Sequence, residues 1–229
     1  MISAIIVAAG SGTRMGGKVD KLFLTVAGEP LVAHTWRRFD EARLIHEIVV
    51  VTRAEQQDAF AELAQQHRFK KPHKIVPGGK ERQDSVRNGL EALSPKTRIV
   101  AIHDGARPCP SDTLIEATID GAQRFGAAVA AQRMTDTVKL SDDGLFIAQH
   151  LDRSKLWSVQ TPQCFQVDII KRALSLVRER GMRVTDDTAA CDLIGQAVAL
   201  IESHTPNPKI SVPEDVPYVE LLLSREQRG

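Results

Sequence analysis

The chain contains a run of small residues that could let the backbone approach a phosphate group closely. It reads Ala8-Ala9-Gly10-Ser11-Gly12-Thr13-Arg14-Met15-Gly16 and directly follows an apolar segment. Small side chains let backbone N–H groups come near an anion, and Arg14 and Lys21 add positive charge. The glycine spacing is one residue too long for a dinucleotide-binding fingerprint, and Val19 stands where an NTPase phosphate loop needs a hydroxyl. We therefore expect a phosphate loop of neither kind, with a plain tight turn as the alternative.

A second segment places two glycines before a polar helix start. It reads Gly78-Gly79-Lys80-Glu81-Arg82-Gln83-Asp84-Ser85-Val86. Adjacent glycines let a backbone pass close to a flat ligand, and Ser85 can offer its hydroxyl to a base or a phosphate. The alternative interpretation is a glycine turn followed by a charged helix start.

A third segment, His103-Asp104-Gly105-Ala106-Arg107-Pro108, follows another apolar run. Asp104 is suited to hold Mg²⁺, which prefers carboxylate and phosphate oxygens. Arg107 can bind a phosphate through two parallel hydrogen bonds. The alternative is a surface turn in which Asp104 and Arg107 pair with each other.

These segments are positioned by alternating apolar runs and helical patterns. Strands are predicted at residues 4–7, 48–51, 74–76, 99–102 and 127–131, and helices at 30–42, 54–67, 81–93 and after Ser111-Asp112. This alternation predicts an α/β fold with a doubly wound, mostly parallel sheet covered on both faces. Ligands of such sheets bind beyond the carboxyl ends of the strands, where the loops starting at Ala8, Pro77 and His103 lie.

The pattern changes after Gln132. Residues 137–140 and 145–150 predict a β-hairpin around a polar turn, followed by a return segment at 157–165, helices at 167–180 and 186–194, a strand at 198–202 and a last helix from about 213. A lone hairpin is marginally stable in water, so it must pack on the body or on a second subunit, and we favour the second subunit. We expect one domain over residues 1–229 with a protruding arm at about 133–153.

The composition limits the partners and the compartment. The net charge is +1, which gives no overall field to attract nucleic acid or an anionic membrane. The chain has three cysteines, none at metal-ligand spacing, and this favours a reducing compartment. The N-terminus reads as a first strand and lacks the basic start of a signal peptide. We expect a cytoplasmic protein.

The order of short motifs along the chain resembles the 2-C-methyl-D-erythritol 4-phosphate cytidylyltransferase family. The resemblance runs from about Ile5 to Asp215, over the blocks AAGSGTRMG, DKLFL, GGKERQDSV, HDGARP, DTVK, DRSKLWSVQTPQCF, TDD and PKIS…PED. It implies a Rossmann-like nucleotidyltransferase fold, CTP and a sugar-alcohol phosphate as substrates, Mg²⁺ as cofactor, and a homodimer whose β-arm reaches the partner's site. The implied reaction belongs to non-mevalonate isoprenoid biosynthesis.

The resemblance also implies roles for individual residues. The catalytic cations would be Arg14, Lys21, Arg153 and Lys209, and the phosphates would lie against the backbone of Ala8, Ala9, Gly10 and Gly12. Gly79 and Ser85 would hold the cytosine, and Asp104 would face the metal. The sugar-alcohol phosphate would be surrounded by Arg107, Thr137, Arg153, Thr161, Thr185 and Lys209, with Thr137 and Arg153 supplied by the other subunit.

Two neighbours of the expected lysines depart from the family pattern. Asp20 stands where the family often has proline and could weaken the field of Lys21, and Pro208 fixes the backbone before Lys209. Attack by one anion on another asks the protein for positioning and charge neutralisation, so His103 is expected to be structural.

Three other functions remain open at this stage. A ribitol 5-phosphate cytidylyltransferase would use a similar polyol phosphate. A non-catalytic CTP sensor would need no second phosphate site. An NAD-dependent oxidoreductase is disfavoured by the glycine spacing.

Overall fold

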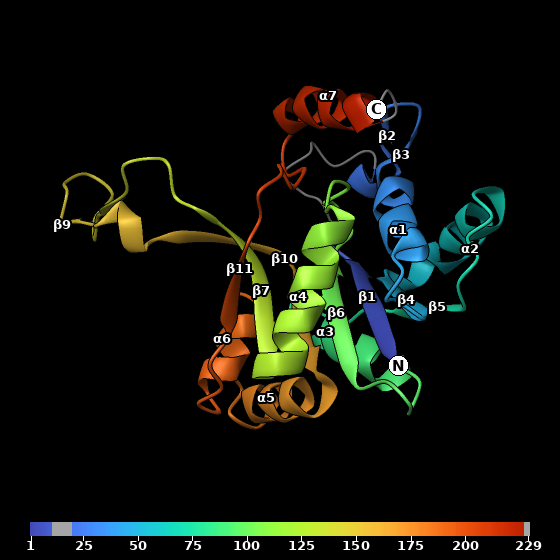
Figure 1. Cartoon of the computed structure of the whole chain (residues 1–229), viewed down its shortest axis with the longest axis horizontal. Coiled ribbons are helices and arrows are strands. Elements are labelled where there is room, and N and C mark those ends of the chain that lie inside the picture. Colours follow the sequence, from blue (N-terminus) through green and yellow to red (C-terminus); the bar gives the residue numbers. More distant parts are fainter. Residues whose placement is uncertain (11–19, 227–229) are drawn as a thin grey trace.

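The computed structural model describes residues 1–10 and 20–226, and in this part of the chain seven strands form one twisted sheet (Figure 1). The strands are β1 (Ile2–Ala8), β4 (Glu47–Thr52), β5 (His73–Pro77), β6 (Ile99–Asp104), β7 (Ala127–Arg133), β10 (Trp157–Gln166) and β11 (Ala199–Glu202). Their order is β11-β7-β10-β6-β1-β4-β5. The predicted mostly parallel sheet is confirmed, with β10 inserted antiparallel between β6 and β7.

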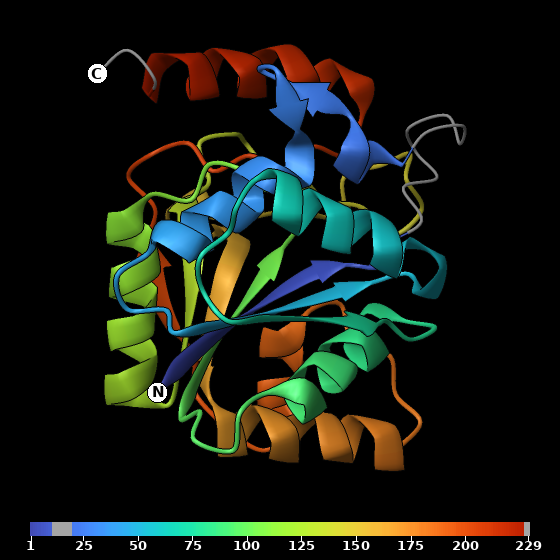
Figure 2. The ribbon, with the colours of Figure 1, turned by 90° about the vertical axis from the view of Figure 1, so that its right-hand side faces the viewer.

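Helices cover both faces of the sheet (Figure 2). One face carries α1 (Leu31–Glu41), α2 (Gln57–Gln66), α4 (Asp112–Phe125) and α7 (Val216–Glu226), and the other carries α3 (Arg82–Ala92), α5 (Val167–Glu179) and α6 (Asp187–Asp192). Successive side chains of a strand point to opposite faces. In β4, Ile48 and Val50 therefore pack under the first group of helices, which we call the first core, and Val49 and Val51 under the second group, the second core.

The helix boundaries follow from local chemistry. The Ser111 hydroxyl accepts a hydrogen bond from the Leu114 N–H at 3.2 Å and so caps the start of α4. Gly126, with φ of 90°, ends this helix. The helix predicted over residues 54–67 begins as a short 3-10 turn, η3 (Ala54–Gln56), before α2. Two further 3-10 turns are η2 (Lys21–Phe23) and η5 (Pro213–Asp215).

Short strand pairs complete the described elements. The pair β2 (Thr25–Val26) and β3 (Glu29–Pro30) precedes α1 and was not predicted. The predicted hairpin contains only β8 (Lys139–Leu140) and β9 (Gln149–His150), followed by η4 (Arg153–Lys155). Its connection is held by side chains instead of a longer ladder: the Ser141 hydroxyl donates to the Phe146 carbonyl at 2.7 Å.

The hairpin region forms an arm that projects from the body (Figure 1). Its tip exposes apolar side chains, with Leu145 83% and Phe146 76% exposed. Large apolar side chains that are fully hydrated cost free energy, so this surface is suited to contact another apolar surface.

The three cysteines are all in the described part of the chain, are buried and form no disulfide. Cys109 and Cys164 lie in the first core and Cys191 in the second. Among the described helices, none has the length and apolar character that crossing a membrane requires.

Candidate active site

A cleft of about 650 Å³ opens beyond the carboxyl ends of β1, β5 and β6, as expected for a sheet of this kind. It brings together segments that are far apart in the sequence. Among its lining residues are the predicted site residues Ala8, Ala9, Gly10, Lys21, Gly79, Ser85, Asp104 and Lys209.

Asp104, the last residue of β6, gathers three cations. Lys209 Nζ donates to its Oδ2 at 2.6 Å. Arg82 Nε lies 3.5 Å from Oδ1, and Arg107 Nε lies 3.9 Å from Oδ2. Burial opposes ionisation of this carboxyl, but Lys209, Arg82 and Arg107 together hold the pKa of Asp104 well below its usual range. The carboxylate is therefore charged at neutral pH and fixes Lys209 in the cleft.

Lys21 reaches the same wall of the cleft from η2. Its Nζ donates to the carbonyl of Ile210 at 3.1 Å. The Ile210 N–H in turn donates to the Ala106 carbonyl at 3.0 Å, which ties the segment after Lys209 to the loop after β6. Two ammonium groups from distant parts of the chain thus face one cleft, an arrangement suited to a polyanion.

The glycine segment after β5 is packed against the first phosphate-loop residues. A side chain at Gly78 would collide with the Ala9 Cβ and lie 2.8 Å from the Ser85 Oγ, so only glycine fits. The Ser85 hydroxyl accepts from the Gly79 N–H at 3.1 Å and donates to the Glu81 carbonyl at 3.2 Å. Ser85 lines the cleft, but its hydroxyl holds the shape of this loop in the structure.

Thr161 lies beneath the cleft and supports Asp104. Its Oγ1 accepts from the Asp104 N–H at 3.1 Å and is hydrogen-bonded to His103 Nδ1 at 3.1 Å. His103 Nε2 donates to the Arg107 carbonyl at 2.9 Å. Burial lowers the pKa of His103 to about 4, so the ring is neutral at pH 7. These contacts favour the structural role expected of His103, and they give Thr161 a supporting position below the cleft surface.

Arg107 is largely buried behind the cleft. Its Nη1 donates to the Asn207 carbonyl at 2.7 Å, and Asn207 Nδ2 donates to the Thr161 carbonyl at 2.7 Å. Arg107 is not among the cleft-lining residues. It lies near Asp104, but both side chains are only 13% exposed, so the pair is not the surface turn of the alternative interpretation. Hydrogen bonds thus hold Asn207 before Pro208 and Lys209 after it. The lysine therefore reaches the cleft although a proline precedes it.

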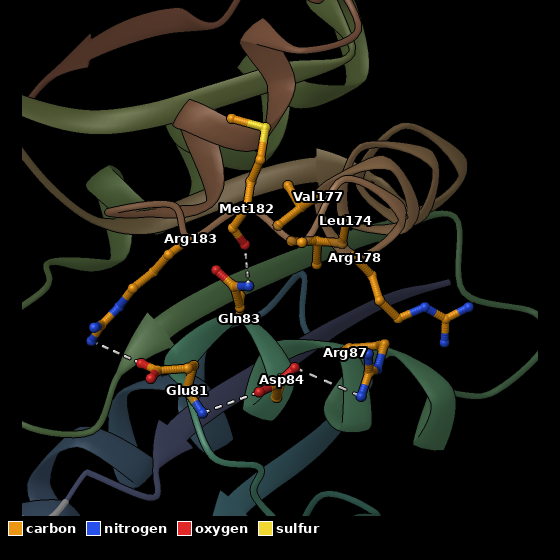
Figure 3. Close-up of a pocket in the computed structure, with 10 residues that line it drawn as sticks. Glu81, Gln83, Asp84, Arg87, Leu174, Val177, Arg178, Met182 and Arg183 are labelled. Carbon is orange, nitrogen blue, oxygen red and sulfur yellow. Dashed lines mark hydrogen bonds and ion pairs between the residues drawn. The ribbon is translucent and has the colours of Figure 1, made fainter.

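Thr185 lies in a neighbouring hollow of about 400 Å³ that shares Glu81, Arg82 and Arg183 with the cleft. A further hollow of about 300 Å³ lies between α3 and α5 (Figure 3). Arg183 Nη2 lies 2.8 Å from Glu81 Oε2, and Gln83 Nε2 donates to the Met182 carbonyl at 2.9 Å. These contacts hold the loop before α6 against the start of α3 and so place Thr185 beside the cleft rim.

Two further predicted residues, Thr137 and Arg153, do not line the cleft of their own chain. Thr137 and Arg153 are exposed on the arm, where Arg153 Nη1 donates to the Thr135 carbonyl at 2.8 Å. Gly12 and Arg14 lie outside the described residues.

Four charged residues that line the cleft were given no role by the sequence, namely Lys80, Glu81, Arg82 and Arg183. Arg82 lines the cleft, and its Nη1 lies 2.7 Å from Asp187 Oδ2, so it bridges Asp104 and the start of α6. Arg183 lines the cleft from the loop before α6. The first three stand inside the block GGKERQDSV and Arg183 stands just before the block TDD, and this position was the only sequence signal for them.

The acidic side chains near Asp104 decide which kind of metal site is possible. Within the described ranges, no group of three or more histidine, cysteine, aspartate or glutamate side chains could hold a metal ion. Mg²⁺ often binds through one or two carboxylates and takes its other ligands from water and substrate phosphates. The ionised carboxylate of Asp104 beside an anion-binding cleft fits this mode. It does not fit a site whose ligands all come from the protein.

Comparison with known proteins identifies relatives over nearly the whole chain. The family model described as 2-C-methyl-D-erythritol 4-phosphate cytidylyltransferase matches residues 2–225. A protein of that name from Caldanaerobacter subterraneus is 40% identical over 98% of this chain and 99% of its own length. One from Pelotomaculum thermopropionicum is 39% identical over 99% of this chain and 95% of its own.

A solved structure has the same fold. The crystal structure of 4-diphosphocytidyl-2C-methyl-D-erythritol synthase from Anaerococcus prevotii matches with a TM-score of 0.87 and 29% identity, over 98% of this chain and 96% of that one.

Proposed function

The chain belongs to the 2-C-methyl-D-erythritol 4-phosphate cytidylyltransferase family, and we propose that it transfers the cytidylyl group of CTP to 2-C-methyl-D-erythritol 4-phosphate with release of pyrophosphate. The observation that carries the proposal is the convergence of Lys21, Asp104 and Lys209 on one cleft. Such a reaction joins two phosphate-bearing substrates, so the site must hold two anions in contact.

In the proposed mechanism, an oxygen of the sugar-alcohol phosphate attacks the α-phosphorus of CTP, and the bond from that phosphorus to the pyrophosphate oxygen breaks. The attacking phosphate is already ionised at neutral pH, so no protein base is required. Lys21 and Lys209 reduce the repulsion between the anions and stabilise the charge of the transition state. Asp104 orients Lys209 through their 2.6 Å contact. Arg14 and Arg153 would add the remaining positive charge.

The family's nucleotidyl transfer calls for a divalent cation, and we propose Mg²⁺. Asp104 would hold it together with phosphate oxygens of CTP, and the bound ion would supply further charge neutralisation.

A homodimer is part of the proposal. Thr137 and Arg153 are on the arm outside their own cleft, and the arm tip is apolar. We propose that the arm, residues 133–153 of a single domain spanning 1–229, docks on a second copy and delivers both side chains to the partner's cleft. The three buried thiols suit a reducing compartment, the cytoplasm.

Pyrophosphate release tests the function directly. The purified protein is incubated with CTP and Mg²⁺, and either 2-C-methyl-D-erythritol 4-phosphate or ribitol 5-phosphate is added. Release with the first substrate and at least about tenfold less with the second is expected, since a pocket built for one polyol discriminates by one or more kcal/mol. Preference for ribitol 5-phosphate would change the substrate assignment, and CTP binding without release would indicate a sensor.

A further inference from the structure

Asp20 is the residue beside Lys21 that departs from the family pattern, and its carboxylate is turned away from the cleft. Lys21 and Leu22 line the cleft, whereas Asp20 is not among the described residues that do. The Asp20 side chain is 9% exposed. A buried carboxylate must be paired or hydrogen-bonded to be tolerated, so its partners indicate what it does.

The Asp20 carboxylate joins two segments of the chain. Its Oδ1 accepts from the Leu22 N–H at 2.9 Å and thereby caps η2. Its Oδ2 accepts from Arg53 Nη2 at 2.8 Å and from Gln56 Nε2 at 2.6 Å. Arg53 and Gln56 lie in the loop and 3-10 turn after β4, and Arg53 Nε donates to Gln56 Oε1 at 3.1 Å. This ring of contacts ties η2 to the segment that follows β4.

Apolar contacts hold the other side of the turn that Asp20 caps. Leu22 is buried in the first core, and the Phe23 and Phe60 rings meet edge to face at 5.1 Å. These apolar contacts anchor the inner side of η2, while Asp20 fixes the side from which Lys21 extends. The Arg53 guanidinium also balances the carboxylate charge, which would otherwise attract the Lys21 ammonium.

We propose that Asp20 is a positioning residue, which through Arg53 and Gln56 orients the turn that presents Lys21 to the nucleotide. The proposal rests on the proposed function, because it takes Lys21 to contact CTP. It predicts that Asp20 acts on the substrate only through Lys21. This dependence separates positioning from a general structural role.

A double-mutant cycle tests that dependence. Asp20→Ala is made in the wild-type chain and in a Lys21→Ala chain, and kcat/KM for CTP and the Kd of CTP, by calorimetry, are measured for all four proteins. In the wild-type background we expect kcat/KM to fall roughly 10–100-fold, the scale of a displaced catalytic group. In the Lys21→Ala background we expect a change below about twofold, since coupled residues are non-additive. Equal losses in both backgrounds, or a loss below twofold in the wild-type chain, would overturn the proposal.

Further variants keep the test decisive if Asp20→Ala folds poorly. Arg53→Met should reproduce most of the loss, and Arg53→Lys should recover it, since one Arg53 nitrogen makes the Asp20 contact. Glu55→Gln is the matched control, because Glu55 Oε1 lies 3.4 Å from the same arginine while its side chain is 72% exposed. Unchanged activity in Arg53→Met would also overturn the proposal. A protein that binds CTP without turnover would disprove the proposed function. The Kd measurements need no turnover, so they would still test whether Asp20 acts on CTP through Lys21.

Discussion

At the scale of single residues, the site consists of charges that are held by distant parts of the chain. Lys209 and Asp104 are 105 positions apart and 2.6 Å apart in space. The sequence predicted both residues from motif blocks, but the contact between them depends on the tertiary fold. For the same reason, the family resemblance named Arg107 as a substrate contact, which stays a prediction, but gave no sign that its guanidinium donates to the Asn207 carbonyl two residues before Lys209.

Lys21→Ala should lower kcat about 10²–10³-fold, the scale of losing one preorganised charged donor. The reason is that Lys21 extends into the cleft from a fixed turn. Steady-state pyrophosphate release measures the effect, and Lys96→Ala, an exposed lysine far from the cleft, serves as the control. An unchanged kcat would remove Lys21 from the mechanism.

His103 should make stability depend on pH. Burial lowers its pKa to about 4, against about 6.5 in the unfolded chain, so acid protonates the unfolded state first. The contribution is fully present above about pH 6.5 and is lost as pH falls toward 4, by roughly 3 kcal/mol in total. Urea unfolding of the wild type and His103→Gln at pH 7 and pH 4.5 should therefore give a stability difference that shrinks in acid. A difference that stays constant would contradict this assignment.

At the scale of elements, apolar periodicity predicted the parallel strands and the helices between them well, because the inner strands β1, β4 and β6 are buried on both faces and the helices bury one face. The helix predicted at residues 81–93 is present as α3, and it packs on the second core through Val86, 0% exposed, and Leu90, 2% exposed. Periodicity carries no information on strand direction, so the antiparallel placement of β10 had no sequence signal. The hairpin strands were predicted too long because two side chains shape the connection between them. The Ser141 hydroxyl donates to the Phe146 carbonyl, and the Asp143 carboxylate accepts from the next N–H groups along the chain.

Gly78→Ala should destabilise the loop between β5 and α3. The added Cβ would meet the Ala9 side chain and the Ser85 Oγ, and overpacking of this kind costs about 1–3 kcal/mol. Chemical denaturation measures the change. Gly10→Ala is the control, since no described atom lies within 4 Å of its added Cβ. We expect that variant to unfold like the wild type and to bind CTP more weakly, because its backbone is expected to face phosphate. Equal stability of the two variants would argue against the packing described.

At the scale of the whole molecule, the proposed site is complete only when two chains combine. The hairpin pattern located the arm in the sequence, and the marginal stability of a lone hairpin indicated that it packs on another surface. The family resemblance named Thr137 and Arg153. The sequence pattern of the arm does not identify the surface on which the arm docks, because that surface belongs to a different part of the fold.

Phe146→Asp should weaken self-association. Phe146 is 76% exposed at the arm tip, and a buried charge at an interface is costly. Light scattering at micromolar concentration should show a shift from dimer to monomer, accompanied by loss of turnover. Phe125→Asp is the matched control, an aromatic residue that is 54% exposed on α4, and it should remain dimeric. A monomeric wild-type protein with full activity would refute the shared site.

Mixing Lys21→Ala and Arg153→Ala chains tests whether the arm is exchanged. A mixed dimer has one cleft with both changes and one with neither, so random pairing should restore about a quarter of wild-type activity. Pyrophosphate release before and after subunit exchange measures the recovery. No recovery in verified mixed dimers would mean that Arg153 serves its own chain.

The buried cysteines have a practical consequence. A thiol reacts with an alkylating reagent as the thiolate, and burial raises the pKa of Cys191 to about 12 and that of Cys164 further still. Labelling therefore requires the cover of each sulfur to open. Because Cys164 is in the first core and Cys191 in the second, the order in which the sulfurs are labelled would report which layer of helices separates from the sheet first. The chain thus carries a native probe in each layer.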